Sequence, residues 1–132
     1  MRGVLFSLAF AALAGGGGAA SADEPIGADA WRALTAGKTL YYYKDGELYG
    51  REYYPNDKGD VVFRFPNGFC SKGRWAFAEG KFCFAFEGEL HCFEHVKRGD
   101  EIVVISDPEG DEQTVERIVD REPLSCDAAL SS

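Results

Sequence analysis

The sequence predicts an all-β fold with one short N-terminal helix, in which about eight strands form an antiparallel up-and-down meander. Three observations support this fold class. Runs rich in aromatic and β-branched residues follow one another from residue 38 onward, and short turn sequences of the hairpin type separate them. With 45% hydrophobic and 14% aromatic residues, the chain is too apolar to stay disordered. Such a meander forms a lipocalin-like small barrel or a strongly curled sheet.

Residues 1–22 have the pattern of a secretory signal peptide. Arg2 precedes an apolar run from Val4 to Leu13, which is too short to span a bilayer, and the small triplet Ala20-Ser21-Ala22 fits a cleavage site. No cysteine stands where a lipoprotein signal places one, so we expect no membrane anchor. Cleavage after Ala22 leaves 110 residues and removes one positive charge, which changes the net charge from −8 to −9. We expect a periplasmic or secreted protein.

The segment after the signal peptide, residues 23–37, is predicted to hold the helix. We expect this helix from Asp29 to Ala36, with Asp29 as its N-cap and Gly37 as the C-terminal stop.

The β domain is predicted over residues 38–126, followed by a flexible tail at 127–132. Hairpin-type turns such as Asp45-Gly46 and Glu87-Gly88 separate the runs. The expected strands are Lys38–Lys44, Glu47–Tyr54, Val61–Phe65, Phe69–Ala78, Lys81–Phe86, Glu89–Val96, Glu101–Ser106 and Glu112–Val119.

Turn geometry in the middle of the meander predicts which side chains share a face, because the register across each turn fixes the strand pairing. A loop at Pro66-Asn67-Gly68 and a two-residue turn at Glu79-Gly80 bring the bulky residues of four strands to one side. We interpret this side as the core: Val61, Phe63, Phe65, Phe69, Trp75, Phe77, Phe82, Phe84 and Phe86. The other side carries Lys72, Arg74, Lys81 and Glu87.

The four cysteines are interpreted as two disulfides, because an even count in a small exported domain is typical of bridges and no C-x-x-C pair suggests zinc. A two-residue turn at Glu87-Gly88 places Cys83 directly opposite Cys92. The remaining pair, Cys70 with Cys126, would tie the C-terminal segment to the barrel.

No catalytic or metal-binding constellation is recognisable. His91 and His95 are the only histidines, and on a strand they lie about 13 Å apart, too far to share one ion. We expect His91 to be half-buried and His95 to lie near the barrel rim. Carboxylates such as Glu47 and Glu52 fit a solvated face. We therefore predict no metal, no cofactor and no enzymatic activity.

Tyrosines are concentrated in the first predicted hairpin. Because neighbouring residues of a strand point to opposite faces, several of these rings should lie outside or at the barrel mouth, where tyrosine often forms contact surfaces. The candidate binding surface comprises Tyr41, Tyr43, Tyr49, Tyr53 and Tyr54. The alternative is that the rings only stabilise the hairpin through cross-strand pairs.

The Tyr-rich hairpin, together with the patterns Gly73-x-Trp75 and Gly80-Lys81-x-Cys83, resembles a family of small exported proteobacterial proteins that is classed as a domain of unknown function. The resemblance covers residues 31 to about 95. It implies export and a β fold, and it brings no catalytic residues.

These observations favour an exported, non-enzymatic β-barrel that acts as a binding module. Excess acid argues against nucleic acid or an anionic membrane as partner, since both require a basic face. One hypothesis is a basic protein partner, as for periplasmic inhibitors of cationic lysozymes. The alternative is a lipocalin-like carrier of a small apolar ligand. The bulky core residues should pack one end of the barrel solid, while Gly50, Ser71 and Gly73 leave space at the other.

Overall fold

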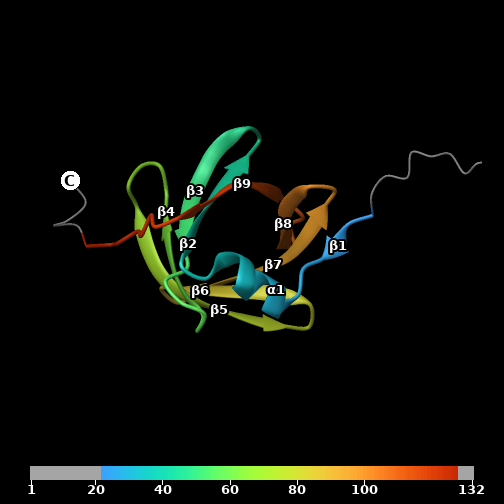
Figure 1. Ribbon diagram of the computed structural model, residues 1–132, viewed down its shortest axis with the longest axis horizontal. Helices are drawn as coiled ribbons and strands as arrows, with labels where there is room; N and C mark the ends of the chain where they lie inside the picture. Colours follow the sequence, from blue (N-terminus) through green and yellow to red (C-terminus); the bar gives the residue numbers. More distant parts are fainter. Residues whose placement is uncertain (1–21, 128–132) are drawn as a thin grey trace, which may run out of the picture.

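Residues 22–127 form a closed eight-stranded antiparallel barrel with one extra short strand, as described by a computed structural model of the chain (Figure 1). Each barrel strand pairs with the next one along the chain, and the last pairs with the first to close the ring. The all-β, up-and-down fold is therefore confirmed, and the sheet closes. The signal peptide predicted at residues 1–22 lies, except for its last residue, outside the described residues, as does the tail from residue 128.

The eight predicted strands all occur, and each begins and ends within two residues of its expected limits. They are β2 (Lys38–Lys44), β3 (Glu47–Tyr53), β4 (Asp60–Arg64), β5 (Cys70–Ala78), β6 (Lys81–Phe86), β7 (Glu89–Arg98), β8 (Glu101–Asp107) and β9 (Glu112–Asp120). The extra strand, β1 (Glu24–Pro25), pairs with the end of β7. Two residues are too few to show any periodicity, so the sequence did not predict β1.

The helix α1 (Ala28–Thr35) lies across one opening of the barrel (Figure 1). It begins one residue earlier than predicted, and its N-cap is Gly27, which has no side chain to cap with. Asp29 instead lies in the first turn, where it forms an ion pair with Arg32 at 3.3 Å. Trp31 and Thr35 stand one turn apart and are both buried, so a single face of this helix seals the barrel end.

The predicted register is present in the middle of the meander. Phe63 pairs with Ser71, and Trp75 pairs with Phe84. The turn between β5 and β6 has positive φ at both residues, Glu79 at 53° and Gly80 at 79°, which is the type I′ geometry that matches the twist of a hairpin. The turns after β2 and β6 have the same pattern. Local turn chemistry therefore sets the register of the strand residues next to these turns.

The two disulfides join Cys83 to Cys92, as the register of the Glu87-Gly88 turn predicts, and Cys70 to Cys126, the pair that then remains. Cys83 and Cys92 are direct cross-strand partners in β6 and β7. The other bridge fastens the segment after β9, which runs back along the barrel wall (Figure 1). Thr39 holds the same segment through a hydrogen bond to the carbonyl of Glu122. Each bridge stabilises the fold by about 2 to 4 kcal/mol.

The core occupies the half of the barrel that α1 covers. Its fully buried members are Trp31, Leu40, Tyr54, Val61 and Phe82. The bulky residues predicted as core do point inward, but those nearest the strand ends are less buried than predicted. Phe69 is 56% exposed and Phe77 is 38% exposed, because each lies where a strand emerges from the barrel.

Candidate functional site: a cavity in the open end of the barrel

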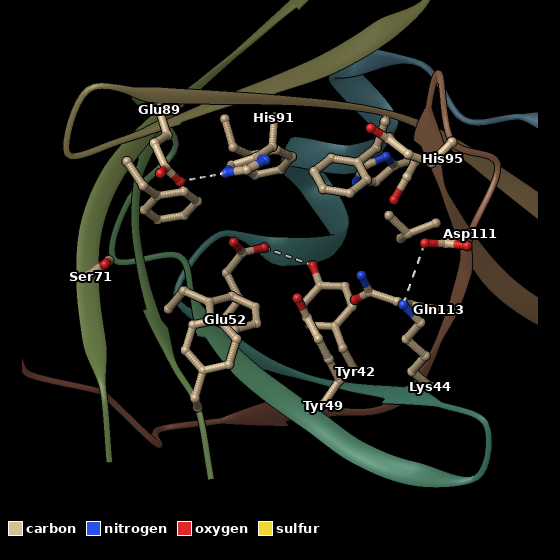
Figure 2. A pocket seen from close by; sticks show the side chains of 18 of the residues that line it. Tyr42, Lys44, Tyr49, Glu52, Ser71, Glu89, His91, His95, Asp111 and Gln113 are labelled. Carbon is tan, nitrogen blue, oxygen red and sulfur yellow. Dashed lines mark hydrogen bonds and ion pairs between the residues drawn. The ribbon is translucent and has the colours of Figure 1, made fainter. Parts of the chain in front are cut away.

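A cavity of about 450 Å³ opens into the barrel at the end opposite α1. Its mouth lies between the turns that follow β2, β4, β6 and β8, since it is lined by Lys44, Phe65, Phe86 and Ser106 at the ends of these strands or just beyond them. Figure 2 shows side chains from opposite walls pointing toward one another across this space. The volume falls within the range of small-molecule sites.

Aromatic rings form the wall beside β4. The ring of Phe63 lies at its centre, with ring centroids 4.8 Å from Phe65, 6.0 Å from both Tyr42 and Tyr49, and 6.4 Å from Phe86. Most of these pairs meet edge to face, which is the favourable arrangement for two quadrupoles. The faces and edges of these rings make one continuous apolar surface on this side of the cavity.

Two glycines allow these rings to lie close to the barrel wall. A Cβ atom on Gly50 would stand 2.4 Å from the ring of Phe63, and one on Gly73 would stand 2.6 Å from the ring of Phe86. Any larger residue would displace the rings. The space that we expected these glycines to leave is thus occupied by aromatic rings, while the lumen beyond them, including Ser71, stays open.

Glu52 lies at the floor of the cavity and is only 4% exposed. Its Oε1 atom accepts hydrogen bonds from the hydroxyls of Tyr42 at 2.7 Å and Tyr54 at 2.6 Å. Among the described residues, none donates a hydrogen bond to Oε2. Burial raises the pKa of this carboxyl from 4.5 to about 7, although both tyrosine hydrogen bonds act in the opposite direction. Glu52 therefore changes charge near neutral pH.

Glu52 points inward because of a β-bulge in the first hairpin. Regular pairing from the Asp45-Gly46 turn would set Tyr42 opposite Tyr49, but the register shifts and Tyr42 pairs with Gly50. Glu52 then stands opposite Leu40, a core residue. One inserted residue thus exchanges the inward-facing and outward-facing side chains in the rest of β3, as bulges do. The expectation that Glu52 lies on a solvated face was wrong for this reason.

His95 lies deep in the same cavity and is 2% exposed. Its ring packs against Trp31 and Phe82, with centroid distances of 4.4 and 4.3 Å. Neither ring nitrogen has a hydrogen-bond partner among residues 22–127. Burial lowers its pKa from 6.5 to about 3, so the imidazole is neutral. The expected position at the barrel rim was wrong, because α1 covers that end and places Trp31 against the ring.

Acidic side chains dominate the mouth. Glu89, Glu109 and Asp111 line it, and Lys44 is the one cationic residue among the described residues there. The Lys44 ammonium lies 3.6 Å from the carboxylate of Asp111, and His91 lies 3.2 Å from Glu89 (Figure 2). His91 is exposed rather than half-buried. With its one cation already paired, the mouth carries a net negative charge.

The tyrosines predicted as a binding surface lie in different surroundings. Tyr54 is 1% exposed, because its hydroxyl is buried against Glu52. Tyr49 lines the cavity mouth instead. Tyr41, Tyr43 and Tyr53 are half-buried.

Tyr41 has a structural role on the outer wall. Its ring lies under the guanidiniums of Arg51 and Arg117, 5.9 and 4.6 Å from its centroid. Its hydroxyl donates to the carboxylate of Glu122, the residue whose carbonyl binds Thr39. These contacts hold the C-terminal segment.

Neither a metal site nor a membrane-spanning helix occurs in the described part of the chain. No three His, Cys, Asp or Glu side chains of residues 22–127 cluster so as to hold a metal ion. Within the same range no helix has the length and apolar character needed to cross a bilayer.

Comparisons with protein-family models, curated proteins and solved structures gave no match to this chain. The resemblance to a family of exported proteins stays a prediction.

Proposed function

We propose that this protein is an exported binding barrel that holds a small organic ligand in the cavity at its open end. One observation carries the proposal: the closed barrel keeps a cavity of about 450 Å³ whose walls are aromatic and whose floor bears the buried polar groups of Glu52 and His95. Concave, mostly apolar sites with a few placed polar groups are typical of ligand pockets. Two disulfides and the predicted signal peptide support export.

A basic protein partner is the second candidate, and the charge of the mouth favours it. A lysine or arginine side chain of such a partner would meet Glu89, Glu109 and Asp111 at the rim. Exposed Phe69 stands at the same mouth and would add apolar contact area. This binding would weaken steeply with salt, because exposed charges are screened. A cationic lysozyme, immobilised and titrated at low and high salt, is the probe for it.

The ligand hypothesis is tested by filling the cavity. Ser71→Trp places a large side chain in the lumen, and Lys72→Trp adds the same ring to the outer face of the same strand. The neutral fluorescent probe N-phenyl-naphthylamine is titrated into the oxidised mature chain and both variants. We expect Ser71→Trp to weaken probe binding about tenfold, which corresponds to about 1.4 kcal/mol, and Lys72→Trp to leave it unchanged. Equal binding of the probe by the wild type and both variants would contradict the proposal.

A further inference from the structure

We infer that the ligand of this cavity is an organic cation, with an apolar and preferably aromatic body and a protonated amine that is held by Glu52 and drawn in by the acidic mouth. The inference rests on the proposed function and specifies its ligand. It follows from four features of the cavity: its charge, its rings, the free oxygen of Glu52 and the unpartnered imidazole of His95.

The charge of the described lining disfavours an anionic ligand. Four carboxylates line the cavity and its mouth: Glu52, Glu89, Glu109 and Asp111. Lys44, the one cationic residue among the described lining residues, is already paired with Asp111 at 3.6 Å. A fatty acid or organic phosphate would bring a negative charge into a low-dielectric space without an available counter-charge, which is strongly unfavourable. A cationic ligand would instead be stabilised by these carboxylates.

The aromatic wall suits the same ligand. Phe63, Phe65, Tyr42, Tyr49 and Phe86 stand next to one another, with neighbouring centroids 4.8 to 6.4 Å apart. The negative face of such a ring attracts a cation, and the attraction grows when the site is desolvated. The same rings would stack against an aromatic ligand body.

Glu52 supplies the counter-charge at the floor. Both tyrosine hydroxyls bind its Oε1 atom, so Oε2 remains for a ligand group. Burying this carboxylate without a cationic partner is costly, and the raised pKa of about 7 is the sign of that cost. A bound ammonium would offset it and lower the pKa again. The bulge that aims Glu52 inward thus places at the cavity floor a carboxylate oxygen that no described residue binds.

His95 adds a second polar contact. Its imidazole is neutral and lies on β7, across the cavity from Glu52 on β3, and both labelled side chains point into the space in Figure 2. A neutral imidazole accepts one hydrogen bond and donates one. The N–H groups of an amine would satisfy the accepting nitrogen, which has no partner among the described residues.

The test compares three indole ligands that differ mainly in charge: tryptamine, a cation; tryptophol, a neutral alcohol; and indoleacetate, an anion. Each is titrated calorimetrically into the oxidised mature chain at pH 8. We expect tryptamine to bind about tenfold more tightly than tryptophol, and indoleacetate to bind more weakly than either. Glu52→Gln should remove the preference for tryptamine and leave tryptophol binding unchanged. Glu101→Gln, on an exposed carboxylate at the start of β8, serves as the matched control.

A pH series with the wild-type protein gives a readout that does not depend on a variant folding well. The groups that face Glu52 are Tyr42 and Tyr54, and His91 and His95 lie across the cavity, with Lys44, Glu89, Glu109 and Asp111 at the mouth. Because Glu52 must be ionised to bind the amine, tryptamine affinity should rise about tenfold from pH 6 to pH 8, with proton release at the lower pH. Glu52→Gln should abolish this rise, and His91→Gln should not.

The outcomes separate the inference from the proposed function. If tryptophol binds as tightly as tryptamine, or tryptamine affinity is independent of pH, the cation inference is wrong and the binding barrel stands. If N-phenyl-naphthylamine and all three indoles fail to bind, the proposed function is wrong as well.

Discussion

The two ends of the barrel are built from the same kind of residue and have opposite properties. At the end that α1 covers, Trp31, Val61, Trp75 and Phe82 are buried and close-packed. At the other end, rings of the same type line a cavity, and Phe69 is largely exposed. Alternating aromatic strands therefore do not decide whether a small barrel is solid or hollow. The difference depends on what enters each opening.

α1 is what fills the packed end. Trp31 inserts between the strands and contacts Tyr54, Phe82 and His95, with centroid distances of 6.0, 5.8 and 4.4 Å. Arg32 adds a cation–π contact over Trp75 at 5.0 Å. The turns around the open end contribute no such residue among residues 22–127, and the rings there lie back over glycines. One end is therefore filled by α1 and the core, and the other keeps an open cavity.

The largest expected effect on stability comes from removing the Trp31 ring, which fills the covered end. Trp31→Ala should lower the free energy of unfolding by about 3 to 5 kcal/mol, since a fully buried ring is lost and a cavity remains. Phe86→Ala, at the open end, should cost about 1 to 2 kcal/mol, because this ring is only half-buried. Urea unfolding of both oxidised variants measures the difference. Equal losses would mean that the two ends do not differ in this way.

The next largest effect on the free energy of unfolding should come from the ionisation of Glu52 and His95, whose contributions change in opposite directions with pH. Glu52 has its pKa raised from 4.5 to about 7 in the fold, so it destabilises the protein increasingly as pH rises through that range, by about 3 kcal/mol in full. His95 has its pKa lowered from 6.5 to about 3, so it destabilises the protein increasingly as pH falls from 6.5 toward 3. Between pH 4.5 and 6.5 their pH dependences nearly cancel, and the two destabilising contributions add to a nearly constant total.

Single variants should reveal each titration as a pH-dependent difference in stability from the wild type. Relative to the wild type, Glu52→Gln should become more stable as pH rises from 5 to 8, by about 3 kcal/mol at most. His95→Gln should gain stability, relative to the wild type, as pH falls from 7 to 4. Urea titrations at several pH values provide both comparisons. If the difference between wild type and Glu52→Gln stays constant with pH, the burial of an ionisable Glu52 is refuted.

A smaller effect on stability should accompany a change in the open wall. Gly50→Ala would bring a methyl group to 2.4 Å from the ring of Phe63, so the ring must tilt into the lumen. We expect a loss of about 1 to 3 kcal/mol and weaker binding of N-phenyl-naphthylamine. Gly27→Ala is the matched control, because nothing lies within 4 Å of its new methyl group. Unchanged probe binding in Gly50→Ala would show that Phe63 does not border the occupied space.

The barrel could be predicted because its signals are local. Two-residue turns such as Glu79-Gly80 set the pairing of each hairpin, and the position of Cys83 opposite Cys92 follows from one of them. Alternation of bulky and polar residues then shows which face points inward. What alternation does not show is depth, which is why the exposure of Phe69 and Phe77 at the strand ends was not predicted.

The candidate site could not be predicted because it depends on two non-local events. The bulge opposite Tyr42 moves Glu52 from the outer to the inner face, and no turn residue marks it; Gly50 is the only hint, since glycine within a strand often accompanies a bulge. The burial of His95 depends on Trp31, which lies 64 positions away in the sequence. Strand periodicity contains no information on where a preceding helix docks.

The most direct test of the account is whether a cationic ligand reaches the floor of the cavity. Nitrogen-15 NMR of the imidazole of His95, recorded during titration of the oxidised protein with tryptamine at pH 8, reports this position. We predict a shift of the accepting ring nitrogen as it gains a hydrogen bond, saturating together with the calorimetric binding curve and absent in Ser71→Trp. Saturable tryptamine binding that leaves the His95 nitrogens unchanged would contradict it.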